Sequence, residues 1–364
     1  MKTRVTRLSA SAPDDISTLA QAISQGQIDP TRVIAVLGKT EGNGCVNDFT
    51  RAFATSTLRR FFAQQLTLSE AKVEERIAFV MSGGTEGGLS PHWLVFEVDA
   101  SEQNADYSLP GLAAGVAFTR DFKPEEIGRL EQVIETRDAV ERAMASAGIQ
   151  HQDDVHFVQI KCPLLTASRI SDAASRGHTT ACHDTYESMG YSRGASALGV
   201  AVALGDLMEE QLSNEKICSD WSLYSTRAST SAGIELLRNE VLVLGNAAGW
   251  DPAYRIGHAV MEDALDTAAI DRALASMPGG AQLTITADNL AGLLVKAEPS
   301  ASGEIRGNRH VMSDDSDING SRHARSLVGG VLAGRLGDTR LFVSGGAEHQ
   351  GPNGGGPLAL ILRA

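Results

Sequence analysis

Short apolar runs alternate along the chain with longer amphipathic stretches. The runs RVIAVLGK, DVHFVQIK and LAGLLVK are rich in aliphatic residues and bounded by polar ones, a pattern that predicts buried strands. Residues 47–63, 191–207 and 321–337 carry apolar side chains at helical spacing and follow Ser, Asn or Asp residues able to cap a helix. This alternation predicts an α/β fold.

One motif, Ser-[Gly/Ala]-Gly-x-Glu, occurs three times, at residues 82–86, 231–235 and 344–348. Each copy follows a strand that ends near a lysine and a helix with an arginine near its start. The lysines are Lys39, Lys161 and Lys296, and the arginines are Arg51, Arg193 and Arg325. Such self-similarity is typical of a fold built from repeated units.

Further helical segments are predicted before each lysine strand, at residues 15–24, 125–148 and 254–277. Each unit therefore has the order helix, lysine strand, arginine helix, strand, serine motif and strand. With one additional strand near 112–122, the chain divides into unit A at 1–104, unit B at 112–249 and unit C at 255–364. The seams are short and only modestly polar, so we expect a single body in which three α/β repeats surround a pseudo-threefold axis.

Composition excludes several classes of function. The 364 residues carry a net charge of −13 without a basic cluster, which argues against a nucleic-acid partner. No apolar run is long enough for a membrane span or a secretory signal, so a cytoplasmic location is expected. The four cysteines lie far apart without a CxxC pair, which indicates reduced thiols.

The three serine motifs predict one shared site. Small residues after a serine allow close approach of a ligand and free two successive backbone N–H groups to bind an oxygen. Three such turns meeting at an axis would suit a small flat molecule with three carbonyl groups. An arginine at a helix start opposes the helix dipole, and an electron-rich ligand would compensate for this.

A lysine beside a serine can act as the base that activates the hydroxyl, provided the amine is neutral. Glu41 and Glu298 each lie two residues after a lysine, whereas Lys161 is followed by Cys-Pro-Leu-Leu. Because a nearby carboxylate raises a lysine pKa, we expect Lys161 to be the catalytic base. Ser231, in the same repeat, would then be the nucleophile.

From about residue 31 onward the chain resembles the cyanuric acid amidohydrolase and barbiturase family. The resemblance rests on GKTEGNGCVNDFTR, FVMSGGTEGGLSPH, FVQIKCPLLT, DTYESMGYSRGASALG, RASTSAGIE, SDDSDIN, RHAR and VSGGAEHQGPNGGGP. It implies a barrel-like α/β fold of three repeats that assembles as a homotetramer. It also implies opening of the cyanuric acid ring to carboxybiuret, which decarboxylates to biuret in s-triazine degradation. It also implies catalysis by Lys161 and Ser231.

The resemblance further implies two sets of binding residues. The substrate would be bound by Arg51, Ser82, Gly83, Arg193, Ser231, Ala232, Arg325, Ser344 and Gly345, with Lys39 and Lys296 serving the other two serines. No cofactor would take part in catalysis, but a structural divalent metal, magnesium, would be held by Glu298, Ala347, Gln350, Gly351, Pro352 and Gly355. One carboxylate with several carbonyl oxygens is a ligand set suited to a hard cation.

Two alternatives stay open at this point. The same fold could act on barbituric acid, in which carbon replaces one ring nitrogen. A noncatalytic protein could use the same serine turns and arginines to bind a flat cyclic imide.

Overall fold

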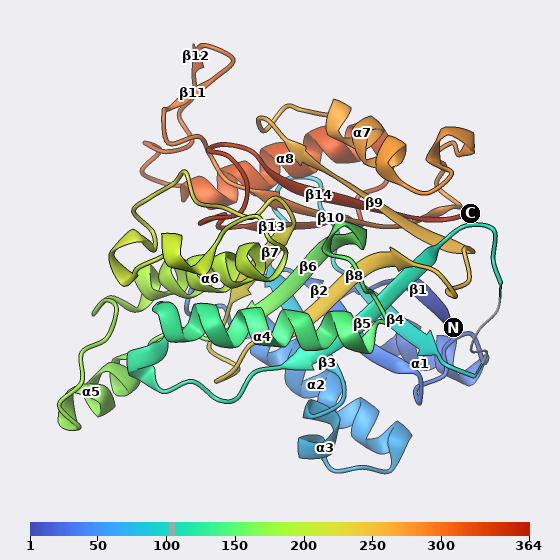
Figure 1. The fold of residues 1–364 in the computed structure, drawn as a ribbon, viewed down its shortest axis with the longest axis horizontal. Coiled ribbons are helices and arrows are strands. Elements are labelled where there is room, and N and C mark those ends of the chain that lie inside the picture. The colour runs from blue at the N-terminus through green and yellow to red at the C-terminus, as the bar shows by residue number, and fades with distance from the viewer. Residues whose placement is uncertain (102–105) are drawn as a thin grey trace.

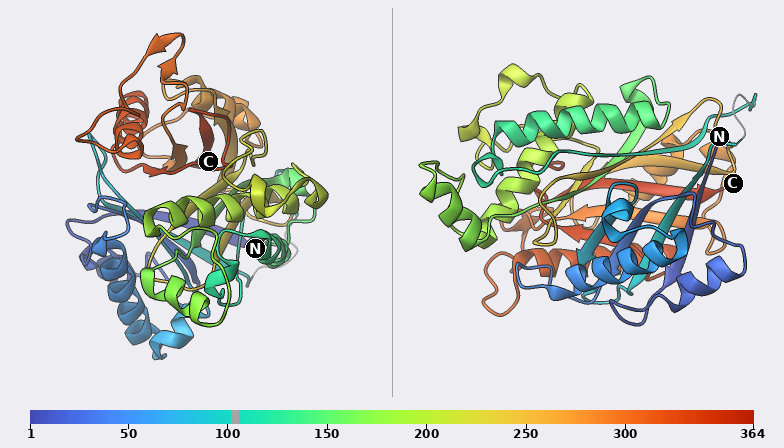
Figure 2. Two further views of the ribbon diagram at one scale, coloured as in Figure 1. Left: turned by 90° about the vertical axis from the view of Figure 1, so that its left-hand side faces the viewer. Right: turned by 90° about the horizontal axis from the view of Figure 1, so that it is seen from below.

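A computed structural model describes residues 1–101 and 106–364 as three four-stranded sheets with helices around them (Figures 1 and 2). The sheets have equivalent strand orders. The first is β1 (Lys2–Ser9), β4 (His92–Asp99), β2 (Val33–Thr40) and β3 (Ala78–Gly83). The second is β5 (Gly111–Phe118), β8 (Glu240–Ala247), β6 (Val155–Cys162) and β7 (Ala228–Ala232). The third is β9 (Tyr254–Met261), β14 (Gly356–Arg363), β10 (Leu290–Ala297) and β13 (Phe342–Gly345).

The α-helices are α1 (Ser17–Ser24), α2 (Phe49–Leu66), α3 (Glu70–Glu74), α4 (Leu130–Ser146), α5 (Ala167–Ser175), α6 (Thr185–Ala203), α7 (Ala268–Ser276) and α8 (Gly320–Leu336). Each repeat has one helix before its lysine strand (α1, α4, α7) and a longer one between the lysine and serine strands (α2, α6, α8), whereas α3 and α5 have no counterpart among the described residues of the third repeat. Short 3-10 helices are η1 (Pro124–Glu126), η2 (Gln152–Asp154), η3 (Glu209–Gln211), η4 (Asn214–Lys216) and η5 (Gly280–Gln282). A small hairpin pairs β11 (Glu304–Ile305) with β12 (Asn308–Arg309).

The helices between the lysine and serine strands, α2, α6 and α8, are capped by Asp or Asn, as predicted. Asp48 accepts a hydrogen bond from the Thr50 amide at the start of α2, and Asp184 and Asn319 serve α6 and α8 in the same way. Each cap satisfies an amide at the first turn that has no partner within the helix. The caps therefore fix where the three central helices begin.

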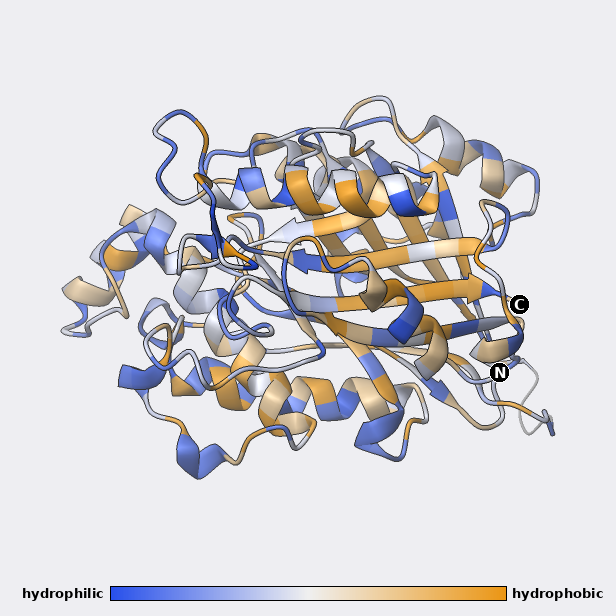
Figure 3. Cartoon of the chain, turned by 90° about the horizontal axis from the view of Figure 1, so that it is seen from above, coloured by the Kyte–Doolittle hydropathy of each residue, from blue (hydrophilic) through white to orange (hydrophobic). Residues whose placement is uncertain are grey.

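The strands have two buried faces. One face of each sheet contributes to a common central cluster, to which Phe96, Phe157 and Phe342 belong. The opposite faces pack against the helices of their own repeat, in separate clusters. Strand side chains alternate between faces, so Lys39 and Lys296, two residues beyond the central Leu37 and Leu294, point toward the axis. Figure 3 shows the resulting apolar strands beneath mixed helices.

Several expectations for the fold need correction. Residues 254–277 are not one helix: β9 pairs with β14 over its whole length, and only α7 is helical. Gly257 allows α7 to pack directly on β9, since a Cβ at this position would lie 2.0 Å from the carbonyl oxygen of Ala273 in α7. Arg193 lies in the middle of α6 rather than at its start. In the described chain no strand pairing joins one sheet to another, so the barrel-like arrangement is not a closed barrel.

The predicted boundaries between the three repeats are not tested by the structure. The end of unit A at residue 104 lies outside the described residues, and the division into units A, B and C stays a prediction. Among the described residues, no helix combines the length and apolar character needed to cross a membrane.

Candidate active site

The three lysines and three serines lie side by side at equivalent strand ends. The lysine strand of each repeat pairs in parallel with its serine strand, and the register places Lys39 opposite Ser82, Lys161 opposite Ser231 and Lys296 opposite Ser344. The three serine strands β3, β7 and β13 also contact one another. Equivalent pairs from segments far apart in sequence therefore meet at the axis.

A small cavity that opens to solvent lies at this meeting point, and the space around its lining atoms, part of it open solvent, amounts to about 270 Å³. Its lining comprises Gly44, Arg51, Ser82, Gly83, Met189, Arg193, Ser231, Ala232, Arg325, Ser344 and Gly345. The structure thus brings together all the predicted substrate-binding residues except the lysines, which lie fully buried behind the serines. Gly44 and Met189 were not predicted, because neither belongs to the repeated motif.

Two of the three lysine amines also bridge neighbouring repeats. Lys296 Nζ donates to Ser344 Oγ at 3.2 Å and to the carbonyl oxygen of Thr230 at 2.5 Å. Lys161 Nζ donates in the same way to Met81 O at 2.7 Å. Each carbonyl belongs to the residue before the serine of another repeat. These contacts couple the geometry of the three serines.

The hydroxyl contacts differ between the repeats. Lys39 Nζ lies 3.3 Å from Ser82 Oγ, whereas Ser231 Oγ shares a 2.9 Å hydrogen bond with Ser344 Oγ. Ser231 and Ser344 thus face each other across the axis, and Ser344 also accepts from Lys296.

The second glycine of each motif is less available than expected. The amide of Gly84 donates to Thr40 O at 2.8 Å, that of Gly233 donates to Cys162 O at 2.9 Å, and that of Gly346 donates to Glu298 Oε2 at 2.7 Å. The expectation of two successive free amides is therefore wrong, because these bonds hold the turn itself. The preceding residues Gly83, Ala232 and Gly345 line the cavity.

Burial lowers the pKa of all three lysines. The pKa of Lys296 falls to about 7, first by burial and then by the charge of Arg193. Burial and Arg325 hold the pKa of Lys39 well below its usual value, and burial also lowers that of Lys161. Neutral amines near physiological pH are the form that a general base requires.

The carboxylate argument for Lys161 is wrong. Glu41 is exposed. Glu298 accepts hydrogen bonds from Ser321 Oγ and the Gly346 amide, and its charge raises the pKa of Lys296 as expected, although less than burial and Arg193 lower it. Lys161 is the lysine with a direct carboxylate contact, since its Nζ lies 2.9 Å from Glu235 Oε1. The carboxylate comes from the last position of the serine motif, which folds back over the strand end. Its repetition in all three motifs was the available sequence signal.

The other two motif glutamates pair with arginines of neighbouring repeats. Arg325 Nη2 lies 2.5 Å from Glu86 Oε1, and Arg193 Nη2 lies 2.6 Å from Glu348 Oε1. Burial opposes the ionised form of Glu348, but Arg193 more than compensates and brings the pKa of Glu348 to about 2. These pairs hold two guanidinium groups at the cavity wall.

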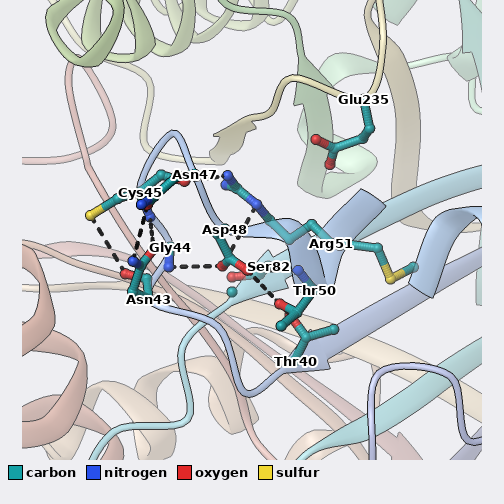
Figure 4. A network of polar contacts seen from close by, with 12 residues as sticks. Thr40, Asn43, Gly44, Cys45, Asn47, Asp48, Thr50, Arg51, Ser82 and Glu235 are labelled. Atoms are coloured by element: carbon teal, nitrogen blue, oxygen red, sulfur yellow. Dashed lines mark hydrogen bonds and ion pairs between the residues drawn. The ribbon is translucent and has the colours of Figure 1, made fainter. Parts of the chain in front are cut away.

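Arg51 makes a different set of contacts. Its Nη1 donates to Ala232 O at 2.9 Å and its Nη2 to Cys45 O at 2.6 Å. Figure 4 shows the guanidinium turned toward the loop that contains Cys45, with Glu235 lying apart from it. The third arginine is therefore held mainly by carbonyl oxygens.

A model of the family described as amidohydrolase ring-opening protein matches residues 4–363. The chain belongs to this family. Among its curated relatives, the cyanuric acid amidohydrolase of Ectopseudomonas oleovorans (strain CECT 5344) is 79% identical to this chain, and the match covers both chains completely. That of Pseudomonas sp. (strain ADP) is 50% identical over 99% of each chain.

Solved structures agree with this membership. The chain matches a crystal structure of the cyanuric acid hydrolase from A. caulinodans with a TM-score of 0.90 and 51% identity. The match covers 99% of this chain and 98% of the other. A second structure, described as cyanuric acid hydrolase and evolutionary innovation by structural concatenation, matches with a TM-score of 0.93 and 48% identity, covering 100% and 99%. Concatenation agrees with the three equivalent sheets.

Most of the predicted metal ligands lie together beside the candidate active site. Glu298, Ala347, Gly351 and Pro352 line one cavity together with Glu348, whereas Gln350 and Gly355 lie outside its lining. Gln350 directs its side chain elsewhere, accepting from the Thr230 amide at 2.7 Å, so only its backbone oxygen is available. The described residues contain no cluster of three or more His, Cys, Asp or Glu side chains suited to a metal. Any ion here would depend mainly on carbonyl oxygens.

Proposed function

We propose that the chain is a cyanuric acid amidohydrolase, which hydrolyses a ring amide of cyanuric acid and releases carboxybiuret. The observation that carries this proposal is the threefold match between site and substrate. Three equivalent sets of serine, buried lysine and arginine surround one small cavity, and cyanuric acid presents three equivalent carbonyl groups. The names of the relatives support the same substrate.

In the proposed mechanism Ser231 is the nucleophile and Lys161 the base. The neutral amine of Lys161 exchanges its contact with Met81 O for Ser231 Oγ and takes the hydroxyl proton. The oxygen attacks one ring carbonyl, and the amide of Ala232 stabilises the oxyanion. The C–N bond then breaks as the Lys161 ammonium gives its proton to the leaving ring nitrogen. Water hydrolyses the resulting serine ester to a carbamate and frees Ser231.

The other two pairs bind the substrate without attacking it. Ser82 with Lys39 and Ser344 with Lys296 contact the two carbonyl groups that do not react. Arg51, Arg193 and Arg325 bring positive charge to the cavity wall, where charge develops on the ring. Fixing all three carbonyls holds the reacting one at attack distance, which reduces the entropic cost of the reaction.

Substrate identity is tested with purified protein incubated separately with cyanuric acid and barbituric acid. We expect loss of cyanuric acid and formation of biuret, detected by mass spectrometry, with much slower turnover of barbituric acid. Preferential turnover of barbituric acid would overturn the substrate while keeping the fold. Recovery of both compounds intact, with binding seen by calorimetry, would instead support a binding protein.

We also propose that a divalent metal, magnesium, stabilises the loop after β13. Burial raises the pKa of Glu298, and the neighbouring Glu348 raises it further, so a cation would relieve two adjacent, partly buried carboxylates. Backbone oxygens of Ala347, Gln350, Gly351, Pro352 and Gly355 would complete the ligand set. When bound, the ion supplies charge neutralisation and no catalytic step.

Chelation is expected to lower the Tm of the wild-type protein by several degrees and to leave that of Glu298→Gln unchanged, because the variant lacks the carboxylate ligand. Elemental analysis of the purified protein measures metal content independently of activity. A wild-type protein without bound divalent metal would contradict the proposal. The homotetramer and the cytoplasmic location stay predictions, and light scattering tests the first.

A further inference from the structure

The three arginine–glutamate pairs around the axis are not equivalent. Glu86 of the first repeat binds Arg325 of the third, and Glu348 of the third binds Arg193 of the second. If every motif glutamate paired with the arginine of the repeat before its own in this cyclic order, Glu235 of the second repeat would bind Arg51 of the first. Glu235 instead contacts Lys161 of its own repeat at 2.9 Å, which is its only ion pair in the described chain.

The contacts of Arg51 agree with this broken symmetry. In Arg193 and Arg325 the Nε atom donates to the paired glutamate, at 2.7 Å and 3.0 Å. The Nε of Arg51 is buried and has no hydrogen-bond partner among residues 1–101 and 106–364, although Asp48 Oδ2 lies 3.8 Å away. The guanidinium donates to carbonyl oxygens of Ala232 and Cys45 in place of a motif glutamate.

We propose that Glu235 is a positioning residue for catalysis, which stabilises the ammonium group that forms when Lys161 takes the proton of Ser231. This inference rests on the proposed roles of Lys161 and Ser231. Of the three motif glutamates, two orient arginines for binding and one is diverted to a lysine. The diversion distinguishes one serine–lysine pair from two that are otherwise equivalent in register.

The surroundings of Lys161 define the direction of the effect. The charged and titratable groups that face its amine are Glu235, Arg51 and the neighbouring thiol of Cys162. Burial lowers the pKa of Lys161, Glu235 raises it, and Arg51 lowers it again. Glu235 itself is almost completely buried, yet Lys161 and Arg51 keep its pKa below the usual value. Glu235 is therefore ionised at neutral pH and favours the protonated lysine.

A carboxylate in this position has two opposing consequences for the reaction. It makes Lys161 a stronger base, which favours proton transfer from Ser231. It also keeps the resting lysine protonated to a higher pH, so the acid limb of kcat/KM reports the pKa of Lys161 in the free enzyme. Removing the charge of Glu235 therefore changes the height and the position of the pH profile together.

The test compares Glu235→Gln with Glu86→Gln, its equivalent in the first repeat. For Glu235→Gln we expect kcat to fall about 10- to 100-fold. The acid limb of kcat/KM should move to lower pH by about 1 to 3 units, since an opposite charge at this distance shifts a pKa by that amount. For Glu86→Gln we expect a raised KM from a misplaced Arg325, with the acid limb unmoved. Glu235→Asp keeps the charge and should leave the acid limb near its wild-type position.

Each outcome has a defined meaning. A raised KM with an unmoved acid limb in Glu235→Gln, as in Glu86→Gln, would overturn the proposal and make Glu235 a binding residue. Retention of the wild-type profile in Glu235→Gln would overturn it as well. Wild-type protein that does not open the ring of cyanuric acid would refute the proposed function instead, and this is measured first.

Discussion

Replacement of Ser231 by alanine is expected to reduce kcat for cyanuric acid on the order of 10⁴-fold or more, because the attacking oxygen is lost. Ser82→Ala and Ser344→Ala remove the same hydroxyl from equivalent strand ends. We expect them to raise KM and to retain measurable turnover. Steady-state kinetics by loss of ultraviolet absorbance, with quantification of biuret, measures all three variants.

Lys161→Met tests whether Lys161 and Ser231 act together as one catalytic unit. Residues that act as one unit lose activity non-additively, so Ser231→Ala combined with Lys161→Met should be no slower than the slower single variant. Circular dichroism confirms that each variant is folded. Near wild-type turnover by Ser231→Ala, together with loss of turnover in Ser82→Ala or Ser344→Ala, would move the nucleophile to another repeat.

Replacement of Arg325 by methionine is expected to destabilise the protein by about 3 kcal/mol and to reduce kcat/KM by at least about 100-fold. The side chains of Arg325 and Glu86 are only 6% and 16% exposed, so the variant leaves a largely buried carboxylate with only the more exposed Arg322, whose Nε lies 3.5 Å from Glu86 Oε1. Loss of a guanidinium from the cavity wall accounts for the kinetic effect. Chemical denaturation and steady-state kinetics measure the two effects separately.

A matched control lies on the same helix. Arg335 pairs with Asp271 at 3.0 Å, but their side chains are 48% and 60% exposed. Arg335→Met should therefore change stability by less than about 1 kcal/mol and leave kcat/KM unchanged. Adding Glu86→Gln to Arg325→Met should recover part of the stability and none of the activity. Equal destabilisation by the Arg325 and Arg335 variants would contradict the role of burial.

Local pattern predicted much of the architecture. The lysine strands, the central helices and their caps follow from apolar periodicity and cap residues, which depend on near neighbours in the chain. Residues 254–277 were misassigned because YRIGHAVM has apolar residues that fit either spacing. Pairing with β14 decided in favour of a strand, and that partner lies almost a hundred residues later in the sequence.

The sequence also determined that the site is threefold. Three copies of one serine motif, each preceded by a lysine strand and an arginine helix, can form equivalent contacts only by meeting at an axis. The residues that line the cavity, apart from Gly44 and Met189, were identified from these motifs and from the family resemblance. Motif positions are shared by all three repeats, so they cannot show how the repeats differ.

Only the tertiary structure decided which charged groups pair. Proximity in sequence suggested Glu41 and Glu298 as partners of lysines and suggested none for Lys161. The fold places Glu41 in solvent and hydrogen-bonds Glu298 to Ser321 and a backbone amide, so that Glu298 acts on Lys296 only by its charge. It brings Glu235 into direct contact with Lys161. Electrostatic interactions depend on distance and burial through space, and here both are set by three sheets packed around a common axis.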